Sequence, residues 1–91
     1  MQTTTSIALG TDDTLIYDDV VVSVEWNSSY QALEYRVDGA YDYIGGKQIV
    51  AKFEPVVESL LEAKLNASQE QISKLKAEWE ESPEARGRYA A

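Results

Sequence analysis

The sequence predicts an α+β domain: a small antiparallel β-sheet, arranged as a hairpin or meander within residues 14–44, packed by C-terminal helices over about 54–65 and 68–81. The main observation is a change in hydrophobic period. Apolar and polar residues alternate in the first half, as in a strand, whereas apolar residues recur at helical spacing in the second half. The change falls at Gly45-Gly46, which is a turn signal.

The strand signal is strongest over residues 14–26. One face of its second half is apolar and consists of Val20, Val22, Val24 and Trp26. A polar turn at residues 27–29 separates it from a second alternating run, residues 30–37, and two such runs predict a β-hairpin. Asp38-Gly39 is a second turn signal, and residues 41–44 after it are a candidate third strand.

Pro55 leaves two interpretations of residues 47–65. A proline costs about 3 kcal/mol in a helix interior but fits the first helical position. We therefore expect a helix from about Glu54 to Leu65, preceded by a strand or an extended segment. The alternative is one kinked helix that begins at Lys47.

A last helix is expected over residues 68–81, with Asn66 or Ser68 as its N-cap. Its apolar stripe and that of the preceding helix are expected to cover the sheet. We expect Trp26 and Leu60 to be core residues. The helices carry more apolar area than a small sheet needs, which leaves a homodimer open.

The two ends of the chain are weakly patterned. Residues 6–9 are a candidate short edge strand, and Ser82-Pro83 ends the last helix. A length of 91 residues favours one domain. We expect this α+β domain to span residues 1–83 and a flexible tail to follow over 84–91.

The negative charge is concentrated in the first half of the chain. Residues 1–45 contain eight carboxylates and one basic residue, a formal charge of −7, so the second half contributes only −1 to the total of −8. A surface of one sign repels nucleic acid and anionic membranes and attracts basic protein surfaces. There is also no apolar run of the roughly 18 residues that a membrane helix needs, and no signal-peptide pattern. We therefore expect a cytoplasmic protein that binds neither nucleic acid nor membrane.

The composition argues against catalysis. Histidine and cysteine are absent, so the commonest general base, the thiol nucleophile and thiolate metal ligands are missing. Gly45-Gly46-Lys47 lacks the spacing of a phosphate-binding loop. Asp12-Asp13 and Asp18-Asp19 offer oxygen ligands, but their spacing matches no calcium loop. We expect no enzymatic activity, no cofactor and no dedicated metal site.

Protein binding is the function class that remains. Tyrosine is enriched at protein interfaces, and Tyr41 and Tyr43 share a face if their segment is extended. Acidic residues surround them, where a nucleic-acid binder would have basic ones. The candidate partner-binding residues are Asp12, Asp13, Asp18, Asp19, Glu25, Glu34, Asp38, Tyr41, Asp42 and Tyr43.

In size, charge and layout, residues 20–65 resemble the small acidic, cysteine-free accessory proteins of bacteriophages and other mobile elements, among them anti-CRISPR proteins and other anti-defence inhibitors. The Val-rich strand, the Val37-Asp38-Gly39 turn and the Glu54-Pro55 helix start carry this resemblance. It implies an inhibitor in a bacterial host that blocks a basic surface of a host or defence-system protein, in some cases by imitating the phosphate charge of DNA. The alternative is a phage structural, assembly or accessory protein whose acidity only serves solubility.

Overall fold

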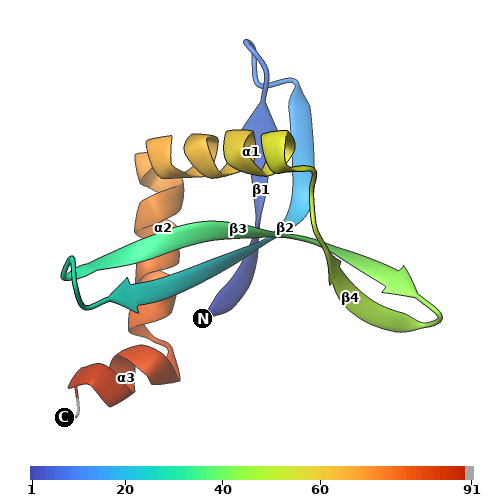
Figure 1. The fold of residues 1–91 in the computed structure, drawn as a ribbon. Coiled ribbons are helices and arrows are strands. Elements are labelled where there is room, and N and C mark those ends of the chain that lie inside the picture. The colour runs from blue at the N-terminus through green and yellow to red at the C-terminus, as the bar shows by residue number, and fades with distance from the viewer. Residues whose placement is uncertain (90–91) are drawn as a thin grey trace.

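The computed structural model describes residues 1–89 and contains, within them, a four-stranded antiparallel sheet and three helices (Figure 1). The sheet has the order β1-β2-β3-β4, so that neighbours in sequence are neighbours in space. The strands are β1 (Gln2–Leu9), β2 (Leu15–Asn27), β3 (Ala32–Ile44) and β4 (Lys47–Ala51), and the helices are α1 (Pro55–Ala67), α2 (Gln69–Glu80) and α3 (Pro83–Tyr89). The predicted α+β class, with a meander followed by helices, is confirmed.

The core lies between one face of the sheet and the helices. The alternation in β2 places Val20, Val22 and Val24 inward as predicted. The buried cluster comprises Ile7, Val20, Val22, Val24, Val37, Leu61, Leu65, Leu75, Trp79 and Ala85. Trp26 packs against this cluster with its ring stacked on that of Trp79, at 6.2 Å between ring centroids. The two tryptophans thereby join the end of β2 to the end of α2.

The prediction that Leu60 is a core residue is wrong. Its side chain is 54% exposed, whereas that of its neighbour Leu61 is fully buried. Residues four apart lie on the same side of a helix, so Val57, Leu61 and Leu65 form the stripe that faces the sheet. Leu60 is about 100° around the helix from Leu61 and points away from that stripe.

Asp38-Gly39 is not a turn, because β3 continues through it to Ile44. The register shifts here: Val21 is opposite Gly39 and Val22 is opposite Val37, which makes Asp38 the extra residue of a β-bulge. A Cβ atom on Gly39 would overlap the carbonyl group of Ala51. The glycine therefore allows the end of β4 to pass close to β3, and does not reverse the chain.

Residues 47–51 are a strand, so the single kinked helix from Lys47 is excluded. Gly45 and Gly46 have φ angles of +58° and +79°, as a two-residue type I′ hairpin turn requires. The helix begins at Pro55, and Ser68 caps α2 by accepting a hydrogen bond from the backbone N–H of Gln71 at 3.3 Å. Both helix starts agree with the prediction.

Regular elements extend further toward both ends of the chain than the sequence pattern indicates. β1 begins at Gln2, well before the candidate edge strand at residues 6–9. Within the predicted tail, α3 covers Pro83–Tyr89 and Ala85 is buried in the core, whereas the predicted flexibility of residues 84–91 stays a prediction. The ammonium group of Met1 lies 2.8 Å from the carboxylate of Glu84, which links the two ends. Residues 90–91 of the predicted tail lie outside the described residues.

Candidate binding surfaces

The predicted binding residues occupy four places along the sheet. Asp12 and Asp13 lie in the turn between β1 and β2, whereas Asp18 and Asp19 lie where β2 is bulged against β1. The remaining residues are on β2 and β3: Glu25, Glu34 and Asp38, and further along β3, Tyr41, Asp42 and Tyr43. A strand of 13 residues extends for about 40 Å, so acids distributed along it cannot form one site.

Glu25, Glu34 and Asp38 are the acids that come closest to a shared surface. They alternate with the inward residues Val24, Leu33 and Val37, so they project from the side of the sheet opposite the helices. Glu25 and Glu34 are directly opposite each other in the register. We name these three carboxylates, with Arg36 among them, the acidic sheet face.

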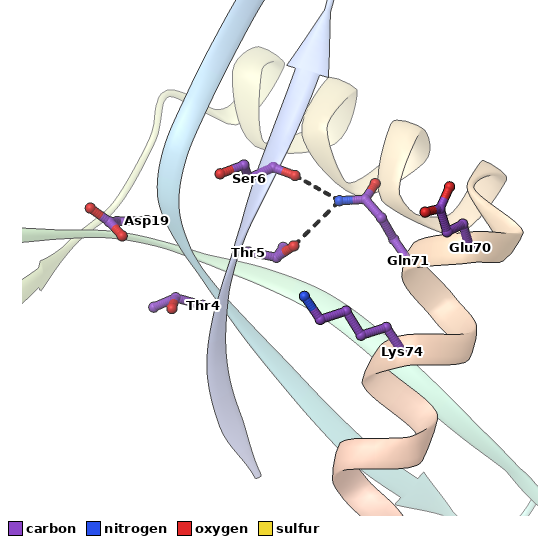
Figure 2. A pocket seen from close by; sticks show the side chains of 7 residues that line it. All are labelled: Thr4, Thr5, Ser6, Asp19, Glu70, Gln71 and Lys74. Carbon is purple, nitrogen blue, oxygen red and sulfur yellow. Dashed lines mark hydrogen bonds between the residues drawn. The ribbon is translucent and has the colours of Figure 1, made fainter.

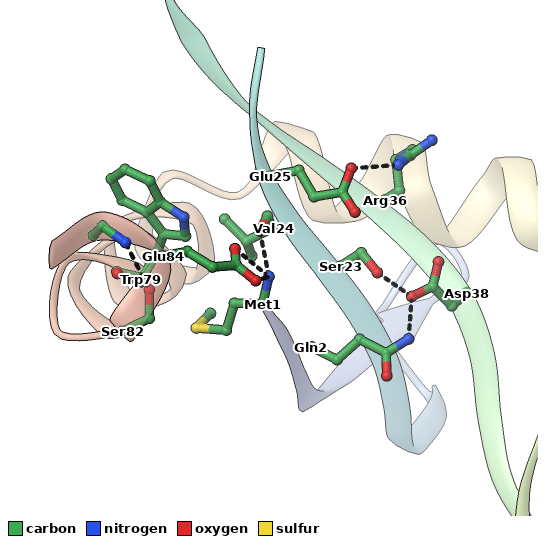
Figure 3. Close-up of polar contacts among 11 residues, drawn as sticks. Met1, Gln2, Ser23, Val24, Glu25, Arg36, Asp38, Trp79, Ser82 and Glu84 are labelled. Atoms are coloured by element: carbon green, nitrogen blue, oxygen red, sulfur yellow. Dashed lines mark hydrogen bonds and ion pairs between the residues drawn. The ribbon is translucent and has the colours of Figure 1, made fainter. Parts of the chain in front are cut away.

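Local hydrogen bonds hold each carboxylate of the acidic sheet face, and Figure 3 shows those of Glu25 and Asp38. Arg36 Nη2 donates to Glu25 Oε2 at 2.8 Å, and Asn27 Nδ2 donates to Glu34 Oε1 at 2.7 Å. Asp38 accepts from Gln2 Nε2 at 3.1 Å and also from Ser23 Oγ, which is itself nearly buried. Asp38 is thus part of the sheet's own hydrogen bonding, whereas Glu25 and Glu34 remain exposed and available to a partner.

The acidic residues near the start of β2 also bond to neighbouring side chains of the same chain. Asp13 Oδ1 lies 2.8 Å from the ammonium group of Lys64 on α1. Asp12 accepts from Thr14 Oγ1, and Asp18 accepts from Ser6 Oγ, each at 2.9 Å. The lysine offsets part of the negative charge at this turn. This end of the sheet is therefore a weaker candidate for attracting a basic partner.

The end of β3 and the start of β4 form an exposed arm, which we name the hairpin arm (Tyr41–Val50). Every residue in it is exposed, and it projects away from the helices (Figure 1). Tyr41 and Tyr43 share a face as predicted, and Tyr43 is 69% exposed. Asp42 is opposite Ile49 in the register, on the other face. The arm thus displays aromatic side chains that the core does not use.

Sequence reasoning missed a groove beside the stacked tryptophans. It has a volume of about 380 Å³ and is lined on one side by Trp26, Leu33 and Tyr35, and on the other by Lys76, Trp79 and Glu80. Burial raises the pKa of Tyr35, and the nearby negative charge of Glu80 raises it further. Residues from β2, β3 and α2 meet here only after folding, so no local pattern signals the groove.

A second groove, of about 580 Å³, runs between β1 and α2 (Figure 2). The amide of Gln71 crosses it and donates to Ser6 O at 2.6 Å and to Thr5 Oγ1 at 3.3 Å. Asp19 and Glu70 contribute negative charge to its lining, and Lys74 contributes positive charge. Its polar groups are thus partly engaged with one another.

Within residues 1–89, no three or more Asp or Glu side chains lie close enough together to hold a metal ion. None of the helices described is both long and apolar enough to cross a membrane. Comparison with known proteins found no family model that matches the chain, and no similar curated protein or solved structure.

Proposed function

We propose that this chain is a non-enzymatic binding protein of the bacterial cytoplasm that occupies a basic surface of a host or defence protein, such as its nucleic-acid-binding surface. The observation that carries the proposal is the acidic sheet face. Glu25 and Glu34 stand opposite each other on adjacent strands, are exposed, and are oriented by donors from the same sheet. An inhibitor of this kind acts by blockade and needs no catalytic group.

The spacing of the carboxylates supports attraction of a basic surface. Glu25 and Glu34 are directly opposite each other on paired strands, where side chains are about 5 Å apart at Cβ. Like charges this close repel each other, and only Arg36 offsets them within the face. Arginine or lysine side chains of a partner would relieve that repulsion and form charge-assisted hydrogen bonds.

The hairpin arm supplies the apolar part of such an interface. Strongly exposed carboxylates steer association, but they contribute little affinity by themselves. Tyrosines that pack into a partner contribute more, because they bury a large area at low entropic cost. Tyr41 and Tyr43 lie on the same strand as Glu34 and are our candidates for these anchors.

The experiment compares two double substitutions that change the net charge equally. Glu25→Gln/Glu34→Gln alters the acidic sheet face, whereas Glu70→Gln/Glu81→Gln alters exposed positions in and just after α2. Each variant and the unmodified chain are immobilised, and proteins captured from a bacterial lysate are quantified by mass spectrometry. Two exposed charges contribute about 0.4–2 kcal/mol, so the first variant should retain about 2- to 30-fold less of the partner.

The captured protein must also bind DNA or RNA, and the unmodified chain must compete with that binding. Equal capture by both variants, or a partner that binds nucleic acid as well in the presence of the chain as in its absence, would contradict the proposal.

The alternative, a structural or assembly protein, also has an observation in its favour. The hairpin arm exposes Ile44 and Ile49 as well as its tyrosines, and most of the carboxylates are engaged by neighbours in the same chain. If acidity only serves solubility, both glutamine variants will behave like the unmodified chain, and only truncation of the arm will affect assembly.

A further inference from the structure

The free edges of the sheet differ in whether side chains bond to their unpaired backbone groups. A strand without a neighbour exposes unpaired N–H and C=O groups, which proteins cover or protect. Along residues 33–37 of β3, Glu62 Oε1 accepts from the N–H of Val37 at 3.1 Å, and Asn66 Nδ2 donates to the carbonyl of Tyr35 at 3.4 Å. Along β1, the amide of Gln71 donates to the carbonyl of Ser6. Side chains of α1 and α2 thus engage these two edges.

The edge of β4 has no such protection among the described residues. In a hairpin closed by a two-residue turn, the residues flanking the turn exchange both hydrogen bonds, and every second pair beyond them does the same. Lys47, Ile49 and Ala51 therefore bond to β3, and the N–H and C=O groups of Gln48 and Val50 point outward. Among the described residues no helix makes extensive contact with β4, which packs mainly against β3.

The side chains along this edge also favour pairing. Ile49 and Val50 are each more than a third exposed. Proteins protect edge strands with proline, bulges, short length or charges, lysine above all, and in β4 the one charged residue is Lys47 at its start, which leaves residues 48–51 uncharged. A regular, apolar strand edge of this kind is a template for another strand.

The charge around β4 bears on which protein supplies the second strand. Residues 43–53 contain no carboxylate and two lysines, whereas the whole chain carries −8. A basic partner would be attracted to the acidic sheet face and repelled at β4. Two copies of the chain repel each other wherever their carboxylates meet, and a contact through β4 brings no carboxylates together, only the lysines at its two ends.

We propose that β4 pairs with β4 of a second copy, antiparallel and with Ile49 on the two-fold axis, so that two sheets join into one. In this register Gln48 and Val50 of each copy exchange hydrogen bonds with Val50 and Gln48 of the other, which uses every outward group of β4. The two Lys47 Cα atoms are about 14 Å apart, but Ala51 of each copy is opposite Lys47 of the other, which brings Lys52 of one copy close to Lys47 of the other, so the pairing should be stronger at higher salt. The pairing does not depend on the function proposed above.

Disulfide trapping tests the register directly, because the chain contains no cysteine. In the proposed dimer the two copies of residue 49 form a non-hydrogen-bonded pair, about 4.5 Å apart at Cα, which a disulfide can bridge. The two copies of residue 48 are about 8 Å apart and cannot be bridged. Ile49→Cys should therefore form covalent dimers on mild oxidation at least about tenfold faster than Gln48→Cys.

Leu60→Cys, on the exposed side of α1, is the control and gives the rate of disulfide formation by random collision between chains. If Ile49→Cys is no faster than Leu60→Cys, the pairing does not occur. If Gln48→Cys is the fastest of the three, the register is wrong and the proposal fails.

Sedimentation equilibrium of the unmodified chain provides a second measurement. The buried area is small, so the dimer is a weak one and is sought at about 0.5 mM. We expect a mass approaching twice 10.2 kDa for the unmodified chain and for Gln48→Thr, but the mass of one chain for Gln48→Pro, which lacks the outward N–H. Circular dichroism must show that the proline variant is folded. A monomeric unmodified chain, or a dimeric proline variant that is folded, overturns the proposal.

Discussion

Leu60 and Leu61 form a matched pair for testing the packing of α1 against the sheet. They are adjacent leucines in one helix, but Leu61 is fully buried and Leu60 is 54% exposed. Truncating a buried leucine to alanine costs about 2–5 kcal/mol, because transfer energy is lost and a cavity remains. A domain of this size has a free energy of unfolding of only about 5–14 kcal/mol.

Leu61→Ala should therefore remove a large share of the stability. For a domain of this length, 1 kcal/mol corresponds to about 4–8 °C in melting temperature, so Leu61→Ala should lower it by at least about 8 °C. Leu60→Ala loses only partly buried area, worth less than about 1 kcal/mol, and alanine has the higher helix propensity. Thermal and urea unfolding followed by circular dichroism measure both variants. Equal losses, or a larger loss for Leu60→Ala, would show that α1 is rotated from the orientation described here.

Three further predictions concern the bulge, pH and nucleic acid. Gly39→Ala should destabilise the fold by about 1–3 kcal/mol, since its Cβ would overlap Ala51, and urea unfolding of the variant at or near the unmodified midpoint would contradict the close approach. The pKa of Tyr35 is raised in the folded state, so its contribution to stability is full below pH 10 and is lost as the pH rises above that value. Tyr35→Phe should thus reduce the fall in melting temperature above pH 10, and an unchanged fall would refute this. Gel-shift titration at low salt should detect no binding of DNA or RNA, because the face and the chain as a whole are negative, and any shift would argue against the electrostatic reasoning.

Strong local patterns predicted much of the fold. The alternation from Val20 to Trp26 predicted which face of β2 is buried, and the rules for proline and serine at helix starts predicted the beginnings of α1 and α2. These features depend on residues near one another in the chain. Local chemistry was therefore sufficient for them.

Features that depend on distant contacts could not be predicted in the same way. Asp38-Gly39 has the composition of a turn, and only the register with β2 shows that it is a bulge within a continuous strand, where the approach of Ala51 requires the glycine. β1 is rich in threonine and has one fully buried residue, Ile7, so its pattern is weak until β2 and the helices pack on it. The helix α3 likewise packs on the core through Ala85. A single alanine gives no sequence signal that it will be buried.

The candidate site was predicted only in part. The first half of the chain carries most of the negative charge, but charge composition does not show on which face of the sheet each carboxylate lies. The length of β2 separates Asp12 and Asp13 from Glu25. Neither Lys64, which pairs with Asp13, nor Arg36, which pairs with Glu25, could be assigned to its partner from the sequence. The part that remains as a coherent surface is the acidic sheet face with the adjoining hairpin arm.

The most direct test of the proposed function is the association rate of the chain with the basic partner captured from the lysate, measured at about 50 and 300 mM salt. Exposed charges act on association over a Debye length, which is shorter at the higher salt. We predict that Glu25→Gln/Glu34→Gln slows association at low salt by about 2- to 30-fold and that the difference shrinks at high salt. Glu70→Gln/Glu81→Gln should match the unmodified chain at both. If the two variants slow association equally, or if neither does, the acidic sheet face is not the surface that attracts the partner.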